Sequence, residues 1–82
     1  MDRSLLRVAA DNFDDAGGRT GPQQMGLICL GLEQMARGAR RGSRDSGLME
    51  VAASNFEDAG NLTGPDQMQR ICLGLEQFAR AL

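Results

Sequence analysis

The stretch that decides the fold occurs twice: TGPQQMGLICLGLEQMAR from Thr20 to Arg37, and TGPDQMQRICLGLEQFAR from Thr63 to Arg80. The similarity extends upstream, so that residues 5–37 and 48–80 are identical at about two-thirds of their positions. A repeat of this length indicates one supersecondary unit that has been duplicated. We therefore expect the two halves of the chain to adopt the same local structure.

The first part of each unit is predicted to be a helix. The segments LLRVAADNFDDA (5–16) and LMEVAASNFEDA (48–59) contain no Gly or Pro and are rich in Ala, which favours a helix. Side chains suited to an N-cap precede them, at Ser4 in the first unit and at Asp45 and Ser46 in the second. Gly17 and Gly60 follow, as is typical of a helix C-terminus.

The repeated Thr-Gly-Pro is predicted to begin a second helix. Pro22 and Pro65 would lie in its first turn, where a missing N–H costs nothing and the fixed φ suits a helix. Thr20 and Thr63 can also satisfy first-turn amides from their side chains. Because the loop is short, the second helix must return along the first and form an antiparallel αα-hairpin.

Each expected helix carries an apolar stripe at spacings of three and four residues. In the first unit the stripe residues are Leu5, Val8, Ala9, Phe13 and Ala16, followed by Met25, Ile28, Cys29, Leu32, Met35 and Ala36. Their equivalents are Leu48, Val51, Ala52, Phe56 and Ala59, followed by Met68, Ile71, Cys72, Leu75, Phe78 and Ala79. We expect the two hairpins to bury these faces against each other.

The predicted fold is therefore all-α: a tandem duplicated αα-hairpin forming a compact four-helix bundle with pseudo-two-fold symmetry. The 82 residues suffice for one small domain. We assign residues 4–37 to repeat 1 and residues 47–82 to repeat 2. Between them, the segment 38–46 is rich in Gly, Ser and Arg and indicates an exposed linker.

Composition narrows the classes of function. The net charge is −2 and all nine basic residues are Arg, which argues against a dedicated nucleic-acid-binding protein. We see no secretory signal and no apolar run long enough for a bilayer, and two cysteines cannot build a framework of several disulfides. We expect a cytoplasmic protein with no membrane partner.

The sequence indicates no catalytic, metal-binding or cofactor-binding residue, and we expect no enzyme activity. There is no His, the usual general base and the commonest metal ligand. Cys29 and Cys72 lie on the apolar stripes, and we interpret them as small buried hydrophobic residues. Zinc requires about four ligands, which two cysteines do not provide. Asn12 and Asn55 lie on the core-facing sides, where we expect each to hydrogen-bond the facing helix or loop.

The two copies differ at positions that suggest a binding surface. Leu27 corresponds to Arg70 and Gly26 to Gln69, while Leu30 and Leu73 lie well off the main stripe of their helices. Two interpretations stay open: these leucines are buried by neighbours on a second side of the helix, or they form an exposed patch that binds a partner.

The leading hypothesis is a small non-enzymatic protein-interaction module, an adaptor or inhibitor that binds a regulatory protein or an enzyme. A protein partner is expected, with a homodimer as a further option. The candidate partner-binding residues are Gly26, Leu27, Leu30, Arg37, Arg40, Arg41, Arg44 and Leu73. The alternative is a structural or engineered helical bundle, a fused homodimer with no partner of its own. The third hypothesis is weak nucleic-acid binding through the Arg-rich linker.

Overall fold

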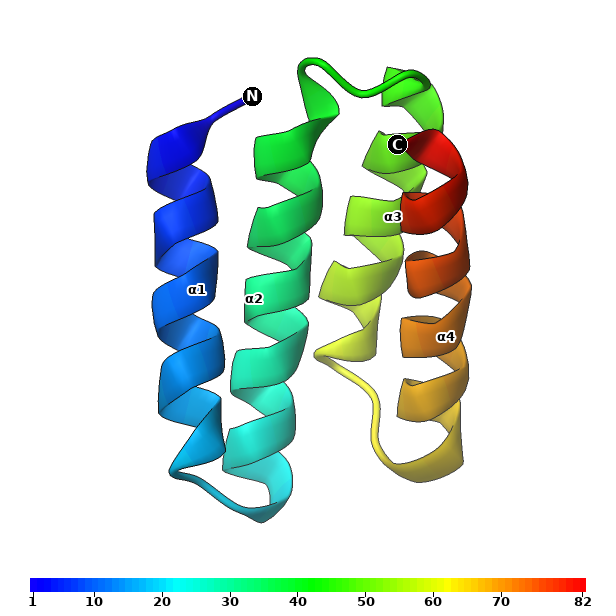
Figure 1. The fold of residues 1–82 in the computed structure, drawn as a ribbon. Coiled ribbons are helices and arrows are strands. Elements are labelled where there is room, and N and C mark those ends of the chain that lie inside the picture. Colours follow the sequence, from blue (N-terminus) through cyan, green and yellow to red (C-terminus); the bar gives the residue numbers. More distant parts are fainter.

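The computed structural model describes residues 1–82 and contains four helices and no strand: α1 (Arg3–Gly17), α2 (Gly21–Arg40), α3 (Ser46–Ala59) and α4 (Gly64–Ala81). Helices α1 and α2 form one hairpin, and α3 and α4 form the other (Figure 1). The radius of gyration is 11.9 Å, close to the roughly 12 Å expected of a globular domain of this length. The predicted all-α fold of two hairpins is confirmed.

The first helix of each hairpin begins after an aspartate. The Asp2 carboxylate accepts a hydrogen bond from the Leu5 N–H at 3.0 Å, and the Asp45 carboxylate accepts one from the Leu48 N–H at 2.9 Å. The prediction for Asp45 is confirmed, whereas that for Ser4 is wrong because Ser4 already lies in the first turn of α1. A carboxylate at the N-cap also interacts favourably with the positive end of the helix dipole.

The second helix of each hairpin begins at the repeated Thr-Gly-Pro. Gly21 and Gly64 have φ of +61° and +60°, a conformation that strains any residue with a Cβ, which explains why both copies have Gly there. Thr20 and Thr63 are the N-cap residues, but their side chains make no capping hydrogen bond. The start of these helices therefore depends on the glycine conformation and on the proline that follows it.

Within each hairpin, the helices contact each other through a phenylalanine and a glycine. A Cβ built on Gly31 would lie 2.5 Å from the Phe13 ring, and one built on Gly74 would lie 2.6 Å from the Phe56 ring. The aromatic rings thus lie directly on bare helix backbone, which allows a close approach of the two helices. The duplicated sequence has produced the same packing twice.

A pair of amide side chains also joins the helices of each hairpin. Asn12 donates from Nδ2 to Oε1 of Gln34 at 2.7 Å, and Asn55 donates to Gln77 in the same way at 2.6 Å. The predicted hydrogen bond between each asparagine and the facing helix is confirmed. These pairs fix the register of the two helices, because a slip of one residue would leave the amides without partners.

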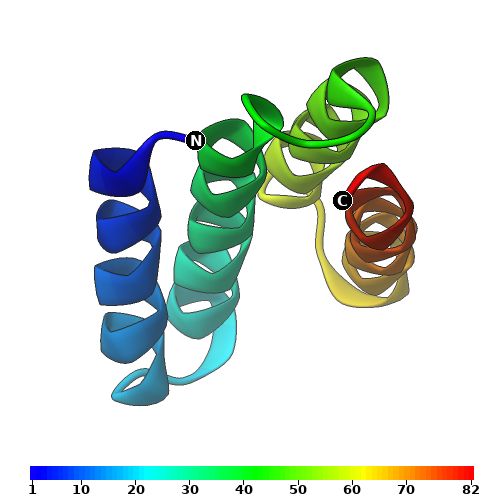
Figure 2. The same cartoon turned by 45° about the horizontal axis from the view of Figure 1, so that its top comes forward.

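The four helices pack in chain order: α2 lies between α1 and α3, and α3 lies between α2 and α4 (Figures 1 and 2). Helices α1 and α4 are the two ends of this row. The main core lies around α3 and comprises Cys29, Leu32, Ala36 and Ala39 of α2, Met49, Ala52, Ala53, Phe56 and Ala59 of α3, and Ile71 and Ala81 of α4. Consequently α3 is covered on two sides and α4 on one.

This arrangement corrects several predicted core positions. Val8 and Val51 are 44% and 47% exposed because no neighbouring helix covers that side of α1 and α3. In α4 the predicted stripe is only partly buried: Met68, Cys72, Leu75 and Ala79 are exposed. The prediction assumed that every apolar stripe is covered, whereas the outer side of α4 has no helix next to it.

The connection between the hairpins is shorter than the predicted linker. Helix α2 continues to Arg40, and Gly38, which was expected in the linker, is a buried helical residue that contacts Leu6. Residues 41–45 then cross to α3. The Asp45 N–H donates to the Ala81 carbonyl at 3.1 Å, which ties this crossing to the end of α4.

Candidate functional site

The outer side of α4 carries a row of exposed apolar side chains, Met68, Cys72, Leu75 and Ala79, which we call the α4 stripe. Their spacings of four, three and four residues place them on one face of the helix. Met68 is 48% and Leu75 is 41% exposed. An apolar row of this length is unusual on the free side of a helix, which ordinarily carries polar residues.

Helix α2 has the same four residues at the equivalent positions, Met25, Cys29, Leu32 and Ala36, which we call the α2 stripe. There, Cys29 is 2%, Leu32 is 8% and Ala36 is 0% exposed, because α3 packs on them. Burial raises the pKa of the Cys29 thiol, since the thiolate would lose its hydration. The two stripes thus have the same chemistry and opposite exposure.

Helix α3 covers the α2 stripe with small residues. Ala53 of α3 is fully buried in the core that also holds Cys29, Leu32 and Ala36. A Cβ built on Gly60, the residue that follows α3, would lie 3.7 Å from the Cβ of Cys29. Small side chains allow the backbones of two helices to approach closely, so that the larger leucine and methionine side chains can fill the remaining space. The neighbour that covers the α2 stripe thus presents small residues, Ala53 and Gly60, on this side.

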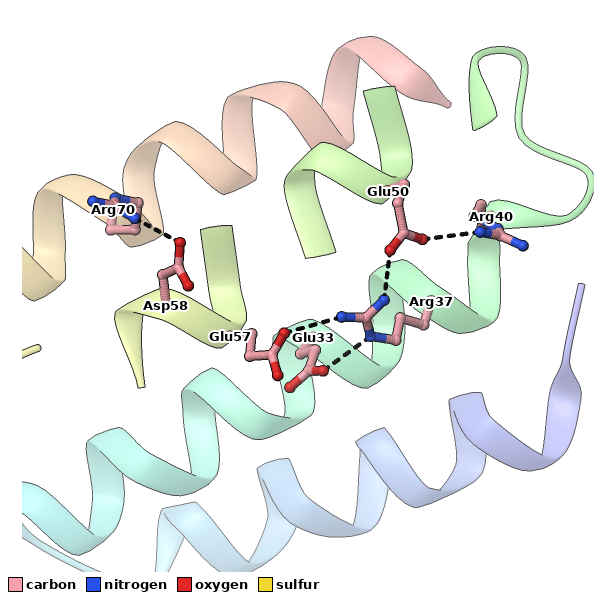
Figure 3. Close-up of polar contacts among 7 residues, drawn as sticks. All are labelled: Glu33, Arg37, Arg40, Glu50, Glu57, Asp58 and Arg70. Atoms are coloured by element: carbon pink, nitrogen blue, oxygen red, sulfur yellow. Dashed lines mark hydrogen bonds and ion pairs between the residues drawn. The ribbon is translucent and has the colours of Figure 1, made fainter. Parts of the chain in front are cut away.

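Ion pairs flank this apolar contact (Figure 3). Arg37 donates to Glu33 at 2.9 Å within α2, and to Glu50 at 2.7 Å and Glu57 at 3.2 Å on α3. Arg40 donates to the other oxygen of Glu50 at 3.0 Å. The hydrogen bond from Arg37 is the main reason that the pKa of Glu50 is lowered, and the hydrogen bond to Glu33 is the main reason that the pKa of Arg37 is raised. Two carboxylates of α3 thus pair with arginines of α2.

Arg80 is the equivalent of Arg37 beside the α4 stripe. It pairs only with Glu76, one turn earlier on the same helix, at 3.1 Å, and its side chain is 70% exposed. No carboxylate of another helix approaches it, in contrast with Glu50 and Glu57 at Arg37. The α4 stripe and the cation of Arg80 beside it are therefore both available to a second molecule.

The predicted arginine cluster is largely engaged within the protein. Arg37 and Arg40 join α2 to α3, and Arg44 donates to the backbone carbonyl of Arg80 at 3.2 Å. Arg41 is exposed. Glu33 has a side chain only 19% exposed and pairs with Arg37. These charges stabilise the contact between the two hairpins.

The remaining predicted residues lie away from the α4 stripe. Gly26 is exposed and Leu27 is half-buried, while Leu30 and Leu73 are 41% and 42% exposed. Of the two interpretations offered by the sequence, Leu30 and Leu73 follow the one that places them at the surface. Leu30 and Gly26 line a shallow groove between α2 and α3. Leu73 lies in a separate groove with Leu62 and Arg70, and Arg70 pairs with Asp58 at 3.0 Å (Figure 3).

The structure shows no metal-binding cluster and no membrane-spanning helix. The structure brings together no group of three or more His, Cys, Asp or Glu side chains that could hold a metal ion. None of its helices combines the length and the apolarity needed to cross a membrane. Comparisons of the chain with protein-family models, with curated proteins and with solved structures found no match. The α4 stripe is thus the strongest candidate for a binding surface in this structure.

Proposed function

We propose that this protein is a non-enzymatic protein-interaction module, an adaptor or inhibitor that binds a helix of a partner protein on the α4 stripe. One observation carries the proposal: the same methionine, cysteine, leucine and alanine are covered by a helix on α2 and are exposed on α4. An apolar row on a helix that is flanked by charges is a typical docking surface for a second amphipathic helix.

The energy available at this surface can be estimated from its residues. Fully burying a Leu or Met side chain contributes roughly 1.5–3 kcal/mol, and Met68 and Leu75 are each already about half covered. Their remaining exposed area, with Cys72 and Ala79, gives a modest apolar contribution. We therefore expect a reversible regulatory contact rather than a permanent complex.

The structure supplies a matched pair of variants for testing this proposal. Leu75 and Leu73 are on the same helix and are 41% and 42% exposed, but only Leu75 belongs to the α4 stripe. Tagged parent, Leu75→Asp and Leu73→Asp would be used to capture proteins from extracts of the source cell. Because both leucines are exposed, the two substitutions should have similar and small effects on folding, which circular dichroism would check.

We expect the parent and Leu73→Asp to capture the same protein, and Leu75→Asp to lose it. If Leu75→Asp retains every protein that the parent captures, the proposal is wrong. If Leu73→Asp alone loses the partner, the partner binds at the off-stripe Leu73 that the sequence suggested, and the proposal for the α4 stripe is wrong.

We assign this function to a reducing compartment such as the cytoplasm, which fits the two free cysteines Cys29 and Cys72.

A further inference from the structure

We infer that the partner helix carries the contact pattern of α3: two small residues seven positions apart, each beside one of two carboxylates that are also seven positions apart. In α3 and its C-cap these are Ala53 and Gly60, with Glu50 and Glu57. The inference rests on the proposed function and goes beyond it, because it states the chemistry by which the α4 stripe would recognise its partner.

The first support is the identity of the two stripes. The α2 and α4 stripes share all four apolar residues, and the glutamate and arginine beside them are also the same, Glu33 and Arg37 on α2 and Glu76 and Arg80 on α4. Two helix faces with the same side chains in the same order favour the same kind of neighbour. The molecule itself shows which neighbour covers such a face, namely α3.

The second support is charge complementarity. Around Arg37, the Glu50 and Glu57 carboxylates lie at 2.7 and 3.2 Å and are supplied entirely by the neighbouring helix. Arg80 has only Glu76 of its own helix. A partner helix seated on the α4 stripe as α3 sits on α2 would bring its two carboxylates to Arg80. Basic residues at those positions would instead be repelled.

A second copy of this chain is a poor fit, because its α1 lacks the acidic pair. The residues of α1 that correspond to Glu50, Ala53, Glu57 and Gly60 are Arg7, Ala10, Asp14 and Gly17. The small residues are kept, but Arg7 replaces a glutamate. Stacking α1 of one copy on α4 of another would bring Arg7 close to Arg80, and like charges at such a contact oppose binding. The occupant is therefore a helix of a different protein, acidic along its contact line.

The chain provides both the test ligand and its control. One peptide comprises residues 45–60, the α3 peptide, and the other comprises residues 2–17, the α1 peptide, both acetylated and amidated. An isolated helix of this length is only marginally formed in water, so binding will be weak. We would therefore titrate each peptide into the 15N-labelled full chain and follow amide chemical shifts by NMR, which detects millimolar affinities.

We expect the α3 peptide to cause saturable shifts of the Met68, Cys72, Leu75 and Ala79 amides. Leu75→Asp should weaken this binding by at least tenfold, and Leu73→Asp should leave it within twofold of the parent. The α1 peptide should bind at least tenfold more weakly than the α3 peptide. An α1 peptide with Arg7→Glu should recover much of that difference, because it then carries both carboxylates.

Three results would overturn the inference: no saturable shifts with the α3 peptide, shifts confined to α2 and α3, or equal binding of the two peptides. If the α3 peptide fails while Leu75→Asp still loses the partner captured from cells, the inferred partner chemistry is wrong and the proposed function stands. If Leu75→Asp still captures the partner, the proposed function is wrong, and the inference about the partner helix is wrong with it.

Discussion

Replacing Gly74 with alanine tests how closely α3 and α4 are packed. The added Cβ would lie 2.6, 2.8 and 3.1 Å from three carbons of the Phe56 ring, well inside the usual contact distance of about 3.5–4 Å. Phe56 is fully buried, so its ring cannot turn away into solvent. Relief of the clash therefore requires α4 to move away from α3.

The expected effect follows from two opposing contributions. An alanine in place of glycine within a helix normally stabilises by roughly 0.5–1 kcal/mol, because the unfolded chain loses conformational freedom. Overpacking of a close-packed core costs about 1–3 kcal/mol. We therefore expect Gly74→Ala to lower the free energy of unfolding by about 1–2 kcal/mol, which for a domain of this size lowers Tm by roughly 4–8 °C per kcal/mol.

Two other glycines serve as controls. Around Gly26 no heavy atom lies within 4 Å of an added Cβ, so Gly26→Ala should stabilise by roughly 0.5–1 kcal/mol. Gly31→Ala meets the Phe13 ring at 2.5 Å, but Phe13 is only partly buried at the end of the row and can shift. Its cost should be smaller than that of Gly74→Ala.

The assay is chemical denaturation of the three variants and the parent, followed by circular dichroism. A Gly74→Ala variant as stable as the parent, or more stable, would refute the close approach of Phe56 to the α4 backbone. Equal stabilisation by Gly74→Ala and Gly26→Ala would refute it most clearly, since it would mean that both sites are open.

Three further predictions concern polar and charged side chains. Gln67→Ala should cost about 1–3 kcal/mol in denaturant unfolding, because buried Gln67 donates to the carbonyl of Ala59 at the end of α3 and to that of Leu62 in the following loop. It should cost more than Gln24→Ala, which removes a single such bond, and the reverse order would contradict this. The pKa of Glu50 is held below its usual value of 4.5, so the contribution of its ion pairs to stability is complete above that pH and is lost as the pH falls through the folded-state pKa. Glu50→Gln should therefore flatten the fall in Tm below about pH 4.5. An unchanged slope of Tm against pH would contradict a stabilising role of Glu50. Arg7→Glu should promote concentration-dependent self-association in light scattering, and Leu75→Asp should reverse it; a variant that stays monomeric would argue against the α4 stripe as a site for acidic helices.

The hairpins were predictable because local chemistry determines them. The Thr-Gly-Pro helix starts, the alanine-rich first helices and the asparagines on the core-facing sides each have one reasonable interpretation, and the structure agrees. Asp2 was missed as the N-cap of α1 and Ser4 was named instead, because both side chains can cap a helix and only the position of the first turn decides between them.

The exposure of the α4 stripe was not predictable from local pattern. Cys29 and Cys72 lie in the same run, ICLGLEQ, and nothing within that run indicates that one is buried and the other exposed. The difference arises from the order of the helices, since α2 has a neighbour on both sides and α4 on one. The prediction that the two hairpins bury their apolar faces was thus right for α2 and wrong for the outer side of α4.

One part of the site could have been found in the sequence. Glu50 corresponds to Arg7, a reversal of charge between otherwise similar helices, and this is the difference expected if only α3 faces an arginine-bearing helix. The pairing itself was not visible, because Arg37 lies in the other hairpin and only folding brings the two together. The sequence pointed to Leu30 and Leu73 instead, because they lie off the main apolar stripe of their helices.

A helix covers the α2 stripe while the α4 stripe is open, and the two cysteines report on this difference directly. Cys29 is 2% exposed and its thiol has a raised pKa, whereas Cys72 is exposed. Under native conditions, Cys72 should react with a thiol reagent such as DTNB at least tenfold faster than Cys29, because Cys29 becomes accessible only when the structure opens locally. The variants Cys29→Ala and Cys72→Ala assign each rate to its cysteine. Slow reaction of both thiols would mean that the α4 stripe is covered, and fast reaction of both would mean that α3 does not cover α2; either result would contradict the account.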